Sequence, residues 1–162
     1  MPTIPIERFQ SELLSRPWGT ELLIADGPGY TGKVLRYRAG HAGGLQYHVR
    51  KDETFYLFSG SGRVSWDRGD GTITSREMRA GDSYHIPAGA VHQFAAVTDC
   101  VVFEASTPHR DDRVRCEEQY GLPDDPDGLP TTWDRKSLTN AELPRPWSTV
   151  LPGGLSTTGW RK

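Results

Sequence analysis

The feature that most constrains the fold is a succession of short apolar and β-branched runs between Thr20 and Ser106, each ended by a turn signal rich in glycine. Such runs favour strands, because branched and aromatic side chains suit a pleated surface. The expected strands are 20–25, 32–38, 44–49, 53–58, 62–66, 72–79, 83–86, 91–97 and 100–106. No long helical pattern separates them, so the sequence predicts an all-β sandwich or barrel rather than a parallel α/β fold.

The two ends of the chain follow other patterns. Residues 1–19 form a lead-in with apolar side chains at helical spacing, so we expect a short helix that ends at Pro17. Residues 122–162 contain three tryptophans without a sustained period. Indole rings gain free energy when they are buried, so we expect this extension to be irregular and docked on the barrel or on a second subunit. The alternative is a disordered tail. The expected barrel therefore occupies residues 20–121.

Composition excludes several classes of protein. The formal net charge is −2, so the sequence lacks the excess of positive charge that is typical of proteins that bind nucleic acid. No apolar run approaches the roughly 20 residues that span a bilayer, and the first residues lack a signal-peptide pattern, so we expect a cytoplasmic protein with no membrane partner. Cys100 and Cys116 form no C-x-x-C pair, which favours two free thiols.

Four side chains with metal-binding atoms occur at spacings that would bring them together. Gln46 and His48 are two residues apart on an expected strand and therefore point to one face. Glu53 follows after a short bend, and His92 follows a Pro-x-Gly turn that steers the next strand back across the barrel. Imidazole, carboxylate and amide oxygen suit one divalent ion with open positions for a substrate. We expect Zn²⁺ first, with Mn²⁺, Fe²⁺, Ni²⁺ or Co²⁺ as alternatives.

These spacings resemble the two motifs of the cupin superfamily. The pattern G-x5-H-x-H-x4-E-x6-G is met from Gly40 to Gly60, with Gln46 at the first histidine. The pattern G-x5-P-x-G-x2-H-x3-N is met from Gly81 to Ala96, with alanine in place of the asparagine. The resemblance implies a small double-stranded β-helix, the jelly-roll cupin barrel, that holds a metal. The alternative is a barrel that has lost its metal and only binds or scaffolds.

Residues 16–121 resemble one cupin branch more closely, the barrel of the type II mannose-6-phosphate isomerases. The stretches that carry this resemblance are Arg16-Pro17-Trp18-Gly19, Gln46-Tyr47-His48, Ile86-Pro87-Ala88-Gly89-Ala90-Val91-His92, and Asp111-Asp112-Arg113-Val114-Arg115 followed by Tyr120-Gly121. The resemblance implies that Gln46 is a ligand and that Lys33 and Arg115 contact an anionic sugar phosphate. The alternatives are a solvated Lys33 and a surface ion pair for Arg115. The chain departs from the branch at Ala39, where proline is usual.

The resemblance favours a metal-dependent isomerase that interconverts an aldose and a ketose, either a sugar or a sugar phosphate. In such a reaction the metal stabilises an enediolate, and a general base moves a proton between adjacent carbons. Glu104 is the best unassigned carboxylate for that base, with a salt-bridge role as the alternative.

Two other functions stay open. His48, Glu53 and His92 could serve an iron- or nickel-dependent oxygenase or a lyase, and O₂ dependence would identify the former. A non-catalytic sugar-binding module would bind without turnover. In each case the expected partner is a small molecule, and cupins of this size commonly form homodimers.

Overall fold

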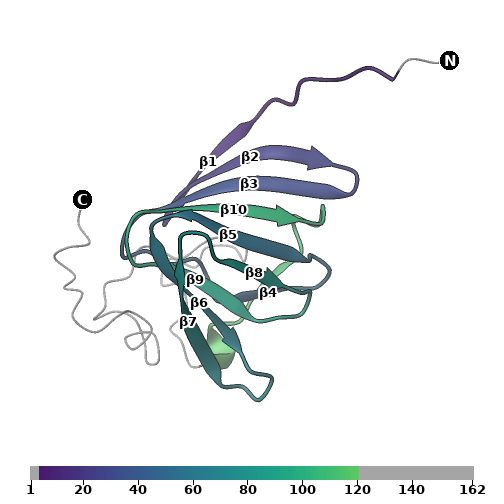
Figure 1. Cartoon of the computed structure of the whole chain (residues 1–162). Helices are drawn as coiled ribbons and strands as arrows, with labels where there is room; N and C mark the ends of the chain where they lie inside the picture. The colour runs from purple at the N-terminus through teal and green to yellow at the C-terminus, as the bar shows by residue number, and fades with distance from the viewer. Residues whose placement is uncertain (1–3, 121–162) are drawn as a thin grey trace.

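The structure, a computed structural model, describes residues 4–120 (Figure 1). The strands are β1 (Glu12–Arg16), β2 (Gly19–Gly27), β3 (Tyr30–Tyr37), β4 (Gln46–His48), β5 (Glu53–Ser59), β6 (Ser61–Asp67), β7 (Ile73–Arg79), β8 (Ser83–Ile86), β9 (His92–Ala96), β10 (Cys100–Ser106) and β11 (Arg113–Arg115). One 3₁₀ turn, Glu118–Tyr120, follows them. Sheet A has the order β1-β2-β3-β10-β5-β8, and sheet B has the order β11-β4-β9-β6-β7.

The expected all-β fold is confirmed, and all nine expected strands are present. Glycine closes the tight connections between them. At Gly60, between β5 and β6, φ is +89°, and an added Cβ would lie 2.2 Å from the carbonyl oxygen of Asp99. This position therefore needs glycine for both conformation and space. All pairings between the strands are antiparallel, and the two sheets face each other to form the barrel (Figure 1).

The expected N-terminal helix is wrong. Residues 4–11 have no regular structure and point away from the barrel, and Glu12–Arg16 forms strand β1 (Figure 1). The reason is tertiary: β1 pairs with β2 along its whole length, with Leu13 opposite Leu22. This pairing satisfies the backbone and gives Leu13 an apolar neighbour, which an isolated two-turn helix would not do. The expected extension at 122–162 lies outside the described residues, so it and the domain bounds stay predictions.

The interior of the barrel is apolar in one part and charged in another. Leu57, Met78 and Val102 are fully buried between the sheets, and Trp18 stacks on Tyr37 with ring centroids 4.0 Å apart. Elsewhere the inward positions of sheet A carry Lys33, Glu53 and Glu104 among other ionisable side chains. Burying so many charges is costly unless they are paired, so this part of the barrel is where a functional site is expected.

The described part of the chain also contains no helix whose length and hydropathy would let it cross a membrane.

Candidate metal centre

His48, Glu53 and His92 come together inside the barrel, from β4, β5 and β9. The Nε2 atom of His92 lies 3.0 Å from Oε1 of Glu53, and the Nε2 atom of His48 lies 3.5 Å from the same oxygen. All three side chains are at least 95% buried. Gln46 is directly opposite His92 in the pairing of β4 with β9, and its Nε2 atom lies 3.5 Å from Nε2 of His48. The structure thus brings together all four residues that the spacing predicted.

Hydrogen bonds fix which ring nitrogen of each histidine faces Glu53. The Nδ1 atom of His48 lies 3.1 Å from a carboxylate oxygen of Asp112, and the Nδ1 atom of His92 lies 2.9 Å from the carbonyl oxygen of Ala90. Both partners are acceptors at neutral pH, so each Nδ1 carries the hydrogen. In the neutral rings the Nε2 lone pairs are then left facing the Glu53 carboxylate.

This arrangement fits a divalent cation. Among the described residues, Oε1 of Gln46, Oε1 of Glu53 and Nε2 of His92 are buried without a hydrogen-bond partner. Two of these atoms, Oε1 of Glu53 and Nε2 of His92, lie 3.0 Å apart, and two electron-rich atoms this close repel each other unless a cation lies beside them. Ligands about 2.1 Å from one octahedral ion lie about 3.0 Å apart, which matches the closest of these separations. Two imidazoles, a carboxylate and an amide oxygen form a donor set suited to zinc or a neighbouring transition metal.

A buried lysine connects this centre with Glu104. The Nζ atom of Lys51 contacts Oε2 of Glu53 and lies 2.5 Å from Oε1 of Glu104. Burial alone would lower the pKa of Lys51, but attraction to Glu104 and Glu53 raises it, so the side chain is an ammonium ion. Burial alone would also raise the pKa of Glu53, yet its hydrogen-bonding and charged neighbours, the Lys51 ammonium among them, hold it well below its ordinary value. The centre therefore presents an ionised carboxylate.

The charged network continues from Glu104 towards the barrel mouth. The Nζ atom of Lys33 lies 3.7 Å from Oε1 of Glu104 and 2.9 Å from Oε1 of Glu21, and Nε of Arg16 donates to Glu21 over 3.2 Å. Burial tends to raise the pKa of Glu21, but the charges of Lys33 and Arg16 lower it overall. Cations and carboxylates thus alternate from Arg16 inward to Glu53.

The network lines one cavity of about 120 Å³ together with Gln46, His48 and Glu53 of the candidate metal centre. Apart from histidine, the residues that line the cavity include five cationic side chains and four carboxylates. A divalent ion at the centre would add two positive charges. The cationic residues are Arg16, Lys33, Lys51, Arg110 and Arg113, and the acidic residues are Glu21, Glu53, Glu104 and Asp111. A cavity with walls of this kind suits a polar ligand and not an apolar one.

Lys33 and Glu104, two of the three residues predicted to contact substrate, line this cavity. Arg115, the third, does not. Arg115, on β11, donates from Nε to both carboxylate oxygens of Glu117, over 3.3 and 3.2 Å. Arg113, on the same strand, lines the cavity instead. The role expected for Arg115 stays a prediction, and Arg113 is a second candidate for it.

Lys51 stands where the mannose-6-phosphate isomerases usually have arginine, which is only a weak signal, and no function was expected for Asp112. Lys51 precedes Glu53 by two residues, and this spacing could have suggested that the two side chains share a face. The only sequence feature that could have drawn attention to Asp112 is its position in the Asp111-Asp112 pair. Its carboxylate accepts hydrogen bonds from His48 and from the backbone amides of Arg50 and Lys51, at 2.6 and 2.8 Å. It thus ties the segment before β11 to the loop that carries the centre.

Comparisons with known proteins agree with this geometry. The cupin domain family matches residues 33–105, whereas no curated protein matches the sequence. Among solved structures, KdgF from Halomonas sp. is 22% identical with a TM-score of 0.55, and covers 62% of this chain and 89% of its own. The capsular polysaccharide assembling protein CapF from Staphylococcus aureus is 19% identical with a TM-score of 0.58, and the match covers 67% of this chain and 34% of that protein.

Oxalate decarboxylase from Bacillus subtilis is 15% identical with a TM-score of 0.67, and the match covers 96% of this chain and 46% of that enzyme. The chain thus spans about a third of CapF and about half of the decarboxylase, but most of KdgF. At these identities the likeness establishes the fold. Taken together, the matched domain, the two-sheet barrel and the convergent histidines and glutamate show that the chain contains a cupin domain over residues 33–105.

Proposed function

We propose that the chain is a metal-dependent enzyme that isomerises a small sugar or sugar phosphate, with Gln46, His48, Glu53 and His92 holding the metal. The observation that supports this most is the convergence of buried, unpartnered donor atoms at a cavity walled by cations. When bound there, a divalent ion supplies a Lewis acid that polarises a carbonyl oxygen.

The buried acid–base groups beside the centre would handle protons. Oε1 of Glu104 lies 2.5 Å from Nζ of Lys51 and 3.7 Å from Nζ of Lys33, and the side chain lines the cavity beside the centre. Lys51 contacts Glu104 on one side and Glu53 on the other, so it can pass a proton between the cavity wall and the centre. We therefore assign Glu104 as the general base, with Lys51 as the neighbouring group that carries the proton onward.

The cations at the mouth would bind the charged end of the substrate. Lys33 lines the cavity together with Arg16, Arg110 and Arg113. Guanidinium groups recognise phosphate and carboxylate through paired hydrogen bonds. The cavity volume of about 120 Å³ suits the reacting end of a sugar, and the guanidinium groups would hold its anionic end near the opening.

A substrate screen on the metal-loaded protein tests this proposal. Aldoses and ketoses, free and phosphorylated, are followed by NMR for interconversion, with inorganic phosphate as competitor. We expect Arg113→Ala to lower kcat/KM on the order of ten- to a hundred-fold and to weaken inhibition by phosphate. Arg115→Ala, on the same strand, is the matched comparison. If Arg115 contacts the anion, this variant should lower kcat/KM more than Arg113→Ala does. No interconversion of any sugar would contradict the isomerase.

One observation favours a second candidate. His48, Glu53 and His92 supply two imidazoles and one carboxylate, the set used by oxygenases that contain non-haem iron. Consumption of O₂ by the iron-loaded protein would identify such an enzyme, whereas a lyase would release product without O₂. Binding of a sugar without any turnover would instead indicate a non-catalytic module.

A further inference from the structure

Residues 107–112 cross from one sheet to the other at the opening of the cavity. They leave β10 in sheet A and lead into β11 in sheet B. Arg110 and Asp111 are exposed and line the cavity, and Arg113 lines it from the start of β11. We call residues 107–112 the mouth strap. Their sequence, Thr-Pro-His-Arg-Asp-Asp, contains no large apolar side chain, so polar contacts and not burial in the core hold the mouth strap in place.

The described contacts attach the mouth strap to the barrel at three points. At the first, the amide of Thr107 donates to the carbonyl oxygen of Asp52 over 3.0 Å, and the amide of Asp52 donates to Oγ1 of Thr107 over 3.1 Å. The second joins Nη1 of Arg110 to Oδ2 of Asp26 over 3.7 Å, and it is weak because both side chains are partly exposed. The third is the carboxylate of Asp112, whose side chain is only 7% exposed. Asp112 is therefore the buried anchor of the mouth strap.

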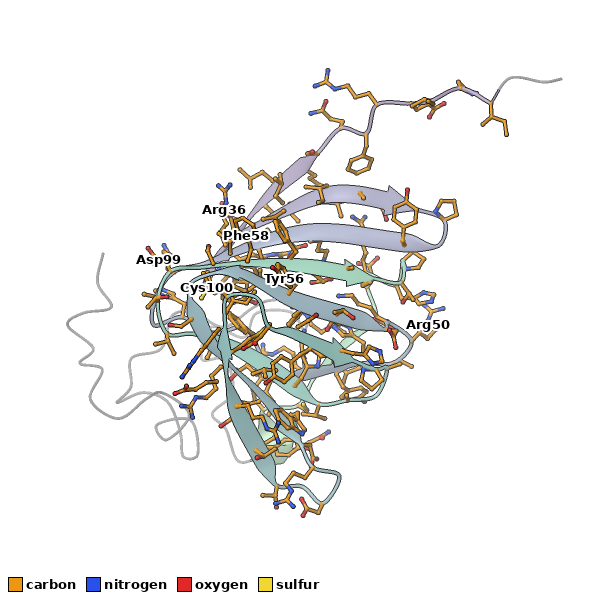
Figure 2. The ribbon with its side chains drawn as sticks, viewed as in Figure 1. Arg36, Arg50, Tyr56, Phe58, Asp99 and Cys100 are labelled. Carbon is orange, nitrogen blue, oxygen red and sulfur yellow. The ribbon has the colours of Figure 1, made fainter. Side chains whose placement is uncertain are left out.

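Asp112 contacts the candidate metal centre and the loop before β5 at the same time. Its Oδ1 atom lies 3.1 Å from Nδ1 of His48. Its Oδ2 atom accepts hydrogen bonds from the amides of Arg50 and Lys51, over 2.6 and 2.8 Å. Figure 2 labels Arg50 on this loop, at the end of the barrel away from Cys100. One carboxylate thus joins the mouth strap both to a metal ligand and to the backbone beside it.

The contact between His48 and Asp112 depends on what His48 binds. When Nε2 of a histidine ligates a cation, its Nδ1–H group becomes a stronger donor, and a carboxylate acceptor in return makes the ring a better ligand. Asp112 directly precedes Arg113 and follows Arg110 by two residues. A firmer hold on the carboxylate therefore also restrains these two guanidinium groups at the cavity. Because coupling between two binding equilibria is reciprocal, an anion that restrains the arginines also favours the ion.

We propose that Asp112 is a positioning residue that couples the metal centre to the anion-binding side of the cavity. With an ion at the centre, Asp112 holds the mouth strap against the loop before β5, and an anion bound by Arg110 and Arg113 raises the affinity for the ion. The anion is of the phosphate or sulfate type, which guanidinium groups bind through paired hydrogen bonds. This inference rests on the metal site and the anion contacts of the proposed function, but it does not require that the ligand be isomerised.

Limited proteolysis measures how firmly the mouth strap is held. Trypsin cleaves after arginine, so opening of the mouth strap exposes the bonds after Arg110 and Arg113, and mass spectrometry identifies each cut. Saturating Zn²⁺ should slow these cuts on the order of ten-fold in the parent, because cleavage follows the open population. In Asp112→Asn, saturating Zn²⁺ should protect much less. The bond after Arg8, in the irregular residues 4–11, is the internal control, and zinc should leave its cleavage unchanged.

Asp111→Asn is the matched control variant. It removes the same charge one residue away, from an exposed side chain, so zinc should still protect the mouth strap. Calorimetry then measures zinc affinity with and without sulfate, an anion that resembles phosphate and keeps zinc soluble. Sulfate should raise the affinity for zinc on the order of ten-fold in the parent and in Asp111→Asn, and only slightly in Asp112→Asn and Arg113→Ala.

Two results would overturn the coupling even though zinc binds. They are equal protection of the mouth strap in the parent and Asp112→Asn, and an equal effect of sulfate in both, which would indicate direct contact between sulfate and the ion. A parent that binds no zinc would overturn both the coupling and the metal site. Zinc-dependent protection in a protein that isomerises no sugar would support the coupling and contradict only the proposed reaction.

Circular dichroism establishes that each variant is folded. If Asp112→Asn is not, the parent and Arg113→Ala decide: a parent without zinc-dependent protection, or an equal effect of sulfate in the two proteins, overturns the coupling.

Discussion

The buried lysine beside the candidate metal centre gives the sharpest test of the charge arrangement. In metal-free protein, Lys51 is the only ammonium that contacts both Glu53 and Glu104 among the described residues. Lys51→Met keeps most of the side-chain volume but leaves two buried carboxylates without their shared cation. Removing one partner of a buried ion pair costs about 3–5 kcal/mol. We expect a value towards the lower end, because Lys33 still lies 3.7 Å from Glu104.

Urea unfolding of the metal-free protein at pH 7 measures this cost. Lys33→Met is the matched control: it should cost less, because Arg16 still pairs with Glu21 and the Lys51 contacts remain. Adding Zn²⁺ should restore much of the stability of Lys51→Met, since the ion takes over neutralisation of Glu53. A loss below about 1 kcal/mol in the metal-free variant would refute the reasoning, because the carboxylates would then not depend on the lysine.

Three more predictions follow from named contacts. Asp112→Asn removes the charged acceptor of His48, so metal affinity measured by calorimetry should fall about ten- to a hundred-fold, and an unchanged affinity would make that contact incidental. The pKa of Glu21 is lowered from 4.5, so its stabilisation is present above pH 4.5 and lost as the pH falls through the folded value. Glu21→Gln should therefore be less stable at pH 7 and decline less steeply in acid; parallel pH profiles would contradict this. Burial raises the pKa of Cys100 to about 11 and that of Cys116 to about 12, so a thiol reagent at pH 7 should modify neither until urea unfolds the protein; rapid labelling of the native protein would contradict their burial.

The strands and the shared face of Gln46 and His48 were predictable because both depend on short-range pattern. Gln46 and His48 are two residues apart on one strand, so their common orientation follows from strand geometry. Glycine-rich turns marked where each strand ends, and the two free thiols followed from the cysteine spacing. These features need no knowledge of which strands become neighbours.

The features that were missed depend on distant partners. Leu13 belongs to a strand only because Leu22 lies opposite it, and the local sequence fits a helix equally well. Lys51 and Glu104 are 53 residues apart, and Asp112 and His48 are 64 residues apart. Likewise, Arg113 lines the cavity on strand β11, which pairs with the distant strand β4 so that Arg113 is opposite His48. Such contacts become visible only when the strands are placed side by side.

The central claim is that Gln46, His48, Glu53 and His92 hold one divalent ion, and metal analysis tests it most directly. Protein purified without added metal, and again after dialysis against Zn²⁺ or Mn²⁺, is measured by elemental analysis next to His48→Ala and His92→Ala. His85→Ala is the control, because His85 is exposed and paired with Asp52 away from the centre. We predict close to one ion per chain in the parent and in His85→Ala, and almost none in the other two variants, with all four proteins folded. Full occupancy in His48→Ala and His92→Ala, or a parent that binds no divalent ion under any of these conditions, would contradict the account.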